Sequence, residues 1–462
     1  MVASSSQTLA SRLQGTMILA PLTRGGNLPF RRLCADFGCD VSVGEMVFAR
    51  HLLKGDFIEK ARLRRADNEP CFGVQMATNN VEEGVRAAAL AAEYGADWVD
   101  LNCGCPIHEA TRRGLGSAML RHPDKLARLV KGIADEISLP LSVKVRIAGG
   151  GSAINVREVV QGLRDAGAAA VTIHGRTADA RYSKSADWDI IRQVVDDGTA
   201  CGSSVPIIGN GDILTHYEAT ERIGRSGVSA VMVGRGALIK PWIFQEFKSG
   251  VAWEPTVDEQ IAVYRRLACY MKEHFGDDAK GRAKSWRFLP WHFDFLLRYR
   301  ALPEEDFGAQ SLEQPLMQTR MPALEDEPPL GRLLTSSNPA VHERLAATLW
   351  DAASDVAAVD ALRSFAEGDD FASLERGATA EDAGAGEVLE LANIPGGGGG
   401  SGASSEMQKK KKVQRRRRAP PPVRTPEEIA RIRAERAAKR ERTGAAPHVD
   451  GRARTQKDAT GA

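Results

Sequence analysis

Eight short runs of apolar and β-branched residues recur along the first half of the chain, and this repeat constrains the fold more than any other feature. The runs occupy residues 17–22, 41–46, 71–76, 98–105, 141–146, 170–175, 205–210 and 230–235. Successive runs start 24 to 43 residues apart, which leaves room for one helix and its loops each time. The segments 81–94, 124–137 and 156–166, which lie between runs, have the composition or the apolar spacing of helices.

Strands that alternate with helices build a parallel sheet with right-handed crossovers. Eight such units predict an α/β fold, a (β/α)8 TIM barrel of roughly 250 residues. A doubly wound sheet is the alternative, but it normally has a glycine fingerprint in its first turn, and none follows Leu22. Beyond residue 256, helices are predicted at 258–275, 284–300 and 342–367 with no strands between them. We therefore expect a small all-α domain after the barrel.

We expect five parts in the 462-residue chain. They are an N-terminal extension at 1–15 that we treat as a frayed terminus, the barrel at 16–252, the helical domain at 253–376, a Gly/Ala-rich flexible linker at 377–407 and a basic, largely disordered tail at 408–462. A run of glycines at 396–400 indicates the linker. The Lys and Arg runs within 409–418 are typical of a nucleic-acid or nuclear-import patch, or of a tail that only keeps a chain in solution.

The net charge of +2 conceals three segments of different charge. Residues 1–300 hold 39 basic and 34 acidic side chains, residues 301–400 hold 5 and 19, and residues 401–462 hold 18 and 7. The 43% hydrophobic content excludes a wholly disordered chain. The seven cysteines are scattered, without a CxxC pair or a Cys/His finger spacing, so we expect reduced thiols, a cytoplasmic or nuclear location and no metal site. No apolar run approaches 18 residues, so we expect no membrane partner.

Polar or conformationally special residues follow all eight predicted strands, at the end of a barrel where active sites are built. Gly-rich turns after the last two strands, beside an Arg, favour a phosphate site. Lys144 could place a positive charge beside the N1–O2 edge of a flavin, although a salt-bridged strand lysine is the alternative. His174 is either a site residue or a satisfied core histidine.

Cys105 lies between Gly104 and Pro106, just past a strand. A thiol with an ordinary pKa is mostly protonated at pH 7 and can donate a proton. Cys103 is two residues away, so a strained redox pair between the two cysteines is an alternative.

Six motifs together carry a resemblance to a known family. They are MILAPLTRGGNLPFRRLCADFGCDVSVGEM (17–46), LNCGCPIHEATRRGLGSAML (101–120), VKVR (143–146), IHGRTADARYSKSADWDII (173–191), IIGNGDI (207–213) and VMVGRGALIKPWIF (231–244). Over about residues 16–300 the chain resembles the tRNA-dihydrouridine synthases, flavin enzymes with an FMN-binding barrel and a small helical domain. It is most similar to the eukaryotic branch that acts on uridine 47 of the tRNA variable loop.

The resemblance implies reduction of the C5=C6 bond of a tRNA uridine to 5,6-dihydrouridine, with FMN as cofactor and NADPH or NADH as reductant. It implies that Cys105 is the proton donor and that Asn102 positions FMN or the uracil. It places Arg176 and Tyr182 near the RNA. The implied FMN-binding residues are Pro21, Leu22, Thr23, Gln75, Lys144, His174, Asn210, Gly211, Asp212, Gly234 and Arg235.

Two other functions stay open at this point. One is another FMN barrel, of the dihydroorotate dehydrogenase type, and the other is a non-catalytic RNA-binding barrel. The expected partner is tRNA, with some mRNA as a further candidate, and we expect a monomer. The eukaryotic branch usually has an N-terminal extension with zinc fingers, which this sequence does not show. We therefore expect additional RNA contacts elsewhere in the chain.

Overall fold

The computed structural model describes residues 5–180, 182–319 and 327–381, and all of them belong to one compact unit. The predicted linker beyond residue 381 and the predicted basic tail at 408–462 lie outside the described residues. Within these residues, no helix is both long enough and apolar enough to cross a membrane.

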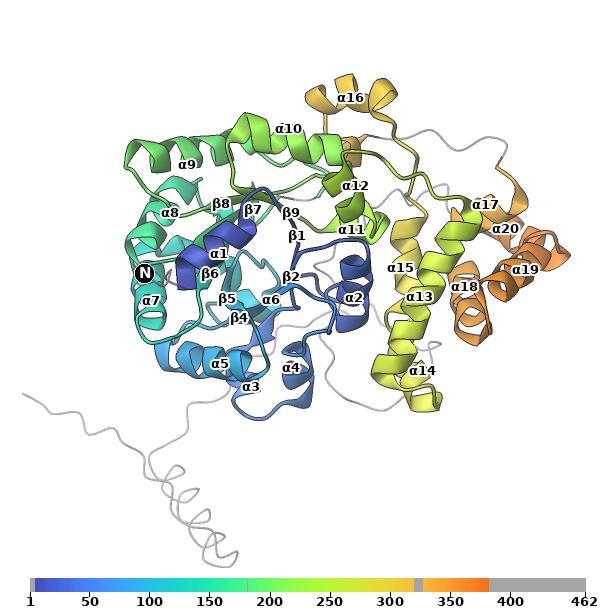
Figure 1. The fold of residues 1–462 in the computed structure, drawn as a ribbon, viewed down its shortest axis with the longest axis horizontal. Helices are drawn as coiled ribbons and strands as arrows, with labels where there is room; N and C mark the ends of the chain where they lie inside the picture. The colour runs from blue at the N-terminus through green and yellow to red at the C-terminus, as the bar shows by residue number, and fades with distance from the viewer. Residues whose placement is uncertain (1–4, 181, 320–326, 382–462) are drawn as a thin grey trace, which may run out of the picture. The chain divides into compact units, whose positions relative to one another are not determined.

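Eight parallel strands form a closed barrel (Figure 1). They are β1 (Met17–Leu19), β2 (Val41–Val43), β4 (Cys71–Ala77), β5 (Trp98–Cys103), β6 (Leu141–Ala148), β7 (Ala170–Thr177), β8 (Ile207–Asn210) and β9 (Ala230–Val233). The sheet closes because β1 pairs with both β2 and β9. A short strand, β3 (Val47–Phe48), adds to the end of β4. Each predicted apolar run overlaps one barrel strand, so the predicted (β/α)8 barrel is confirmed.

Helices cover the outside of the barrel. The longer ones are α2 (Leu28–Asp36), α5 (Val81–Glu93), α7 (Pro123–Ala134), α8 (Val156–Asp165), α9 (Trp188–Ala200) and α10 (His216–Ser226). Short helices in the connections are α3 (Ala49–Leu52), α4 (Phe57–Arg62), α6 (His108–Thr111), η1 (Gly116–Arg121), α11 (Arg235–Ile239) and α12 (Ile243–Ser249). Side chains cap several helix starts: Asn80 accepts from the Glu83 amide, and Thr215 and Glu218 form a capping box.

Strand register places the polar residues at the carboxyl ends of the strands side by side. Asn102 on β5 is the register partner of Lys144 on β6. His174 on β7 is the partner of Arg146 on β6 and of Asn210 on β8. One end of the barrel therefore presents a ring of polar side chains.

The other end of the barrel is covered by α1 (Ser5–Leu13), which lies across the opening in Figure 1. Leu9 and Leu13, four residues apart on one helix face, are buried in a cluster with Ile18, Trp98 and Ile208. The prediction of a frayed terminus at 1–15 is therefore wrong for the described part of this segment. The apolar amino-terminal ends of the strands need a cover, and this short helix supplies it.

The chain beyond the barrel is helical, as predicted. Its elements are α13 (Val257–Phe275), α14 (Ala279–Ser285), α15 (Leu289–Leu296), α16 (Glu304–Glu313), η2 (Leu316–Gln318), α17 (Pro329–Leu334), α18 (Pro339–Asp351), α19 (Asp355–Ala366) and α20 (Asp369–Glu381). Two predicted helices are each broken in two. The helix predicted at 284–300 breaks before α15, whose first turn contains Pro290. The one predicted at 342–367 breaks before Ser354, which caps α19.

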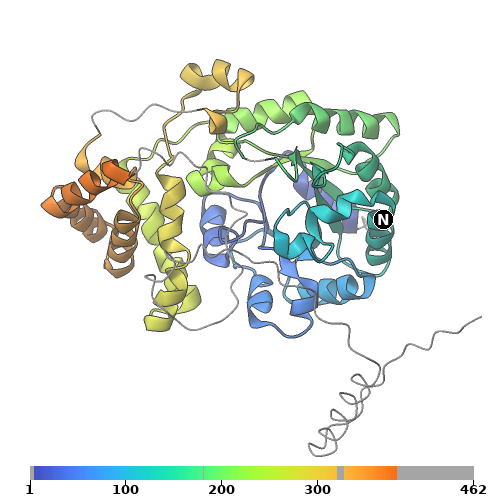
Figure 2. The same cartoon turned by 180° about the vertical axis from the view of Figure 1, so that it is seen from behind.

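The helical region packs directly on the barrel, where α13 lies beside α2 (Figures 1 and 2). Arg32 of α2 forms an ion pair with Glu273 of α13, and its guanidinium lies 3.8 Å from the centre of the Tyr270 ring. The rings of Phe30 and His292 stack with their centres 4.8 Å apart. Barrel and helical region therefore share one apolar core.

We predict that Leu13→Ala lowers the free energy of unfolding by about 2–5 kcal/mol, because it leaves a cavity at a position that is 0% exposed. Urea denaturation followed by circular dichroism measures the change. Gln14→Ala, at the next and exposed position, is the matched control and should change stability by less than about 0.5 kcal/mol. Equal stability of the two variants would show that α1 is not part of the core.

Candidate active site

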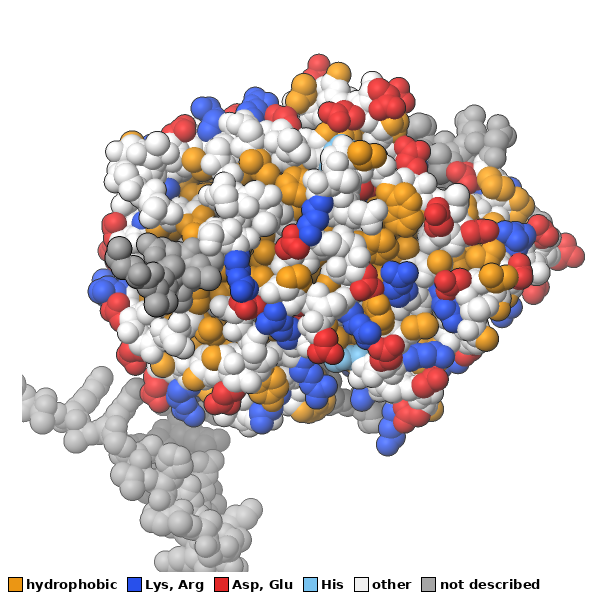
Figure 3. Space-filling view, in the orientation of Figure 1, with side chains coloured by type: hydrophobic (Ala, Val, Ile, Leu, Met, Phe, Trp, Pro, Cys, Tyr) orange, Lys and Arg blue, Asp and Glu red, His pale blue; other side chains and the backbone are white. Residues whose placement is uncertain are grey.

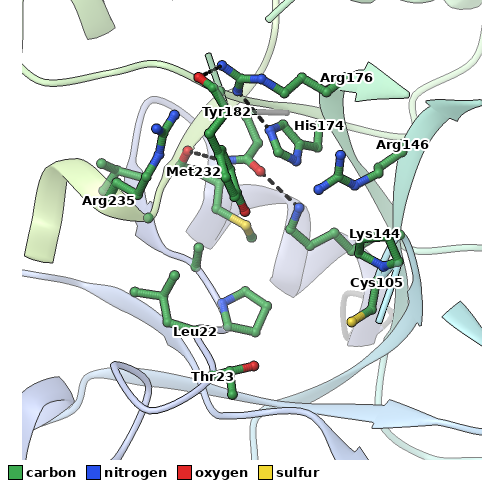
Figure 4. Close-up of a pocket in the computed structure, with 18 of the residues that line it drawn as sticks. Leu22, Thr23, Cys105, Lys144, Arg146, His174, Arg176, Tyr182, Met232 and Arg235 are labelled. Carbon is green, nitrogen blue, oxygen red and sulfur yellow. Dashed lines mark hydrogen bonds between the residues drawn. The ribbon is translucent and has the colours of Figure 1, made fainter. Parts of the chain in front are cut away.

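A cavity of about 340 Å³ opens at the polar end of the barrel (Figure 4). Its volume lies in the range of small-molecule sites, roughly 300–1,000 Å³. All fifteen residues predicted from the sequence line it: Pro21, Leu22, Thr23, Gln75, Asn102, Cys105, Lys144, His174, Arg176, Tyr182, Asn210, Gly211, Asp212, Gly234 and Arg235. Their roles toward a ligand stay predictions, whereas their common location is a finding.

A buried carboxylate fixes the amide side chains at the base of the cavity. Asp100 on β5 accepts hydrogen bonds from Ser142 Oγ at 2.5 Å and from Gln75 Nε2 at 2.7 Å. Gln75 Oε1 in turn accepts from Asn102 Nδ2 at 2.7 Å, and Asn102 Oδ1 accepts from the Cys105 amide at 3.0 Å. This chain of bonds determines which way both amides point. Burial raises the pKa of Asp100.

Positive charge is concentrated on one wall. Lys144 Nζ donates to Asn210 Oδ1 at 2.9 Å, and Arg146 Nη1 donates to the Thr177 carbonyl at 2.7 Å. Both acceptors are neutral, and in the part of the chain that the structure describes neither cation pairs with a carboxylate. Burial and the nearby Arg146 lower the pKa of Lys144 to about 8. An anionic ligand would compensate this charge.

His174 lies among these cations and is uncharged at neutral pH. Burial and the charges of Arg146, Lys144, Arg176 and Arg235 hold its pKa well below the usual range. Its Nε2 lies 3.2 Å from Arg176 Nη1, so a neutral ring can accept that hydrogen bond. His174 is therefore both a pocket residue and a satisfied buried histidine.

The turns after β8 and β9 form what we call the anion cup, made of Asn210, Gly211, Asp212, Gly234 and Arg235. Gly211 has a φ of +135°, and a Cβ there would lie 2.5 Å from that of Ala186, so only glycine lets the turn pack this closely. Asp212 is also left-handed, at φ +51°. The cup is thus built from tight backbone with one guanidinium beside it.

Asp212 binds two guanidiniums, that of Arg235 in the cup and that of Arg176 on β7. Its carboxylate accepts from Arg176 Nη2 at 2.6 and 2.7 Å and from Arg235 Nη2 at 2.7 Å. The backbone amide of Ala186 adds a fourth bond at 2.8 Å. A carboxylate repels phosphate, so we assign Asp212 to orienting the two arginines rather than to direct contact with an anion.

Arg176 does not face outward, although the resemblance placed it near the RNA. Its side chain is 1% exposed, and it donates to Asp212 and to the Lys184 carbonyl at 2.7 Å. It lines the cavity and does not reach the outer surface. Tyr182 lies over the cup instead, with its ring centre 4.3 Å from the Arg235 guanidinium.

Cys105 lies on the same side of the cavity as Lys144 and Arg146, facing Leu22 and Arg235 on the other side (Figure 4). Burial raises the pKa of its thiol, which stays protonated at neutral pH. The backbone here is tightly held, because Ser117 N donates to the Cys105 carbonyl at 3.0 Å. The cavity therefore contains a fixed and protonated thiol.

The proposed redox pair of the two cysteines is absent from the described structure, where both are free thiols. Strand β5 ends at Cys103, so the alternation along a strand does not extend to Cys105. Cys103 is buried with its sulfur 4.0 Å from that of Met119. It is a core residue.

Sequence reasoning missed several residues of the cavity. Asp100, which supports the lining residue Gln75 from behind, was also missed, although an acidic residue inside a buried strand is a visible signal. Arg146 is the last residue of the VKVR motif but was assigned no role. Met232 and Met317 contribute apolar wall. Together the walls suit a flat ring system, and the cup and the unpaired cations suit a phosphate on the same molecule.

Comparison with known proteins agrees with this geometry. The family model described as "Dihydrouridine synthase (Dus)" matches residues 18–298. A human protein named "tRNA-dihydrouridine(47) synthase [NAD(P)(+)]-like" is 39% identical over 289 residues, which are 62% of this chain and 44% of that protein. The Coprinopsis cinerea protein named "tRNA-dihydrouridine(47) synthase [NAD(P)(+)]" is 39% identical over 296 residues, with the same coverage of 62% and 44%.

A rice protein (Oryza sativa subsp. japonica) with the same name as the human one is 38% identical over 289 residues, covering 61% of this chain and 41% of its own length. The chain thus matches less than half the length of these relatives. The family model itself spans more than half of this chain, from β1 to the end of α15, and includes the whole barrel. The chain belongs to the dihydrouridine synthase family.

Proposed function

We propose that the chain is a flavin-dependent tRNA-dihydrouridine synthase that reduces the C5=C6 bond of a tRNA uridine, uridine 47 of the variable loop, using NADPH or NADH. The observation that carries the proposal is a protonated, fixed Cys105 thiol in the same cavity as the anion cup. The relatives named as tRNA-dihydrouridine(47) synthases support the substrate and the reductant.

FMN fits the residues present, and when bound it supplies the hydride that the reaction adds to C6 of the uracil. Arg235 and the backbone of the anion cup would bind its phosphate. The Lys144 ammonium would hold the polar edge of its ring. Gln75 Nε2, with one hydrogen bonded to Asp100, has a second hydrogen for that edge.

Cys105 would add a proton to C5 of the uracil from Sγ. The hydride at C6 and this proton at C5 together saturate the double bond, and solvent reprotonates the thiolate afterwards. The raised pKa of Cys105 favours this role, because it keeps the proton on sulfur until C5 gains negative charge. The Asn102 amide fixes the Cys105 backbone and so the position of Sγ.

The uridine has to leave its base stack to reach the cavity, as bases do in base-modifying enzymes. Lys284, Arg287 and Arg298 are exposed on the helical region. We propose that they contact phosphates of the tRNA, which would hold the RNA while the base enters. The chain would act as a monomer.

We predict that Cys105→Ala still binds FMN but forms dihydrouridine at a rate at least about 100-fold lower than the wild type, because the proton donor is absent. Mass spectrometry of tRNA after incubation with the full chain and NADPH measures the product. Cys201→Ala is the matched control, because that thiol is exposed and lies outside the cavity. Wild-type turnover by Cys105→Ala would disprove the role of this thiol.

Reduction of free orotate or uridine without tRNA would favour a pyrimidine dehydrogenase instead.

We predict that FMN affinity falls as the pH rises above about 8. Lys144 in the free cavity has a pKa of about 8, so it is positively charged below that pH and neutral above it. Binding an anion favours the charged form, and affinity is therefore lost as the lysine deprotonates. Flavin titrations of the wild type and of Lys144→Gln at pH 7 and pH 9 measure this. Lys144→Gln should bind FMN more weakly than the wild type at pH 7, and its FMN affinity should change less between pH 7 and pH 9. An equal change in both proteins would show that a group other than Lys144 titrates.

A further inference from the structure

The chain that follows the family match returns to the mouth of the barrel. The match ends at residue 298, and the chain continues through Leu302, α16 and η2. The Tyr217 phenol of α10 donates to the Leu302 carbonyl at 3.2 Å, and α16 packs beside α10 (Figure 1). We name residues 302–318 the strap.

Glu218 anchors the strap to the chain that directly follows Asp212 of the anion cup. Its Oε1 accepts from the Leu316 amide at 2.9 Å, while its Oε2 accepts from the amides of Leu214 and Thr215 at 2.9 and 3.1 Å. Glu218 and Leu316 are each 1% exposed. One buried carboxylate thus accepts hydrogen bonds from both the strap and the chain that follows Asp212. It fixes the position of these two segments relative to each other.

The end of the strap reaches the cavity. Met317 lines it. The side-chain amide of Gln318 donates to Asp212 Oδ1 at 3.1 Å and to the Tyr182 carbonyl at 2.8 Å. The same Oδ1 accepts from Arg235 at 2.7 Å. Gln318 therefore connects the loop that carries Tyr182 with the carboxylate that directs Arg235.

We propose that the strap completes the cofactor cavity from outside the family match, and that Gln318 is a positioning residue for Arg235. The proposal rests on the proposed function, because it assumes that the anion cup holds the phosphate of FMN. Gln318 is neutral, so it stabilises Asp212 without adding a third cation. It thereby fixes the direction of the carboxylate and leaves the charge of Arg235 for the ligand.

Gln318→Ala tests the proposal through two flavins that differ only in phosphate. The full chain is stripped of flavin and titrated with FMN and with riboflavin, and flavin fluorescence reports binding. The dissociation constant for FMN should rise about tenfold, because a hydrogen bond to a charged group is lost and Arg235 is less well oriented. The constant for riboflavin, which has no phosphate, should stay within about twofold.

Two further variants sharpen the test. Gln318→Glu is nearly isosteric but places a carboxylate against Asp212 in place of an amide donor. It should therefore weaken the binding of FMN more than that of riboflavin, and it provides the test if Gln318→Ala does not fold. Gln310→Ala removes the same type of side chain from an exposed position of α16. It should bind both flavins as the wild type does.

An equal loss for both flavins, or no loss for FMN, would overturn the role of Gln318, because a residue that only supports the fold cannot discriminate phosphate. If the wild type binds FMN and modifies tRNA while Gln318→Ala and Gln318→Glu keep its FMN-to-riboflavin ratio, the strap assignment alone is wrong. If the wild type binds neither flavin, the proposed function is wrong and the strap assignment with it.

Discussion

The buried carboxylate of Asp212 is the interaction on which the candidate site depends. Its side chain is fully shielded from solvent, and it joins Arg176 from β7, Arg235 from the turn after β9, and Gln318 from the strap. An unpaired charge at such depth is strongly unfavourable, and removing one partner of a buried pair typically costs about 3–5 kcal/mol. Asp212 therefore allows two guanidiniums to lie beside one cavity and still leaves a net positive charge there.

Burial shifts the pKa values of two groups in the cavity, the Cys105 thiol and the Lys144 ammonium, in opposite directions. It raises the pKa of the Cys105 thiol and lowers that of the Lys144 ammonium. At neutral pH the thiol stays protonated, as a proton donor must be, and the lysine, with a pKa of about 8, is mostly positively charged. Asp100 organises the neighbouring amides without entering the cavity. A single desolvated environment thus supplies a proton, a cation and oriented donors.

The barrel could be predicted because strands buried on both faces appear in sequence as continuous apolar runs. Most cavity residues lie at the carboxyl ends of such runs, and the resemblance to the dihydrouridine synthases supplied their expected roles. Tyr182, in the loop after β7, was expected from the resemblance alone. The helix α1, which covers the opposite end of the barrel, could not be predicted in this way. It is short, and only its burial in one cluster with Trp98 and Ile208 shows that it closes the barrel. Likewise, the resemblance placed Arg176 near the RNA, and only the fold shows that its guanidinium is bonded to the buried Asp212 carboxylate. Gln318 lies far along the chain from Asp212, and no local signal connects them.

The positions of individual acidic side chains in the segment 301–400 explain why this segment can be acidic. Glu304, Glu305 and Asp306 occupy the first turn of α16, where the helix dipole favours negative charge, and acidic side chains gather over this helix in Figure 3.

Other acids of that segment pair with arginines of α13 and α14: Asp355 with Arg265 and Asp351 with Arg282, at 2.8 and 3.0 Å. Exposed pairs of this kind add little stability. Their main consequence is electrostatic, because they neutralise part of the basic charge of α13 and α14. Lys284, Arg287 and Arg298 stay exposed on the same helical region, so their side chains are accessible for the proposed contacts with tRNA phosphates.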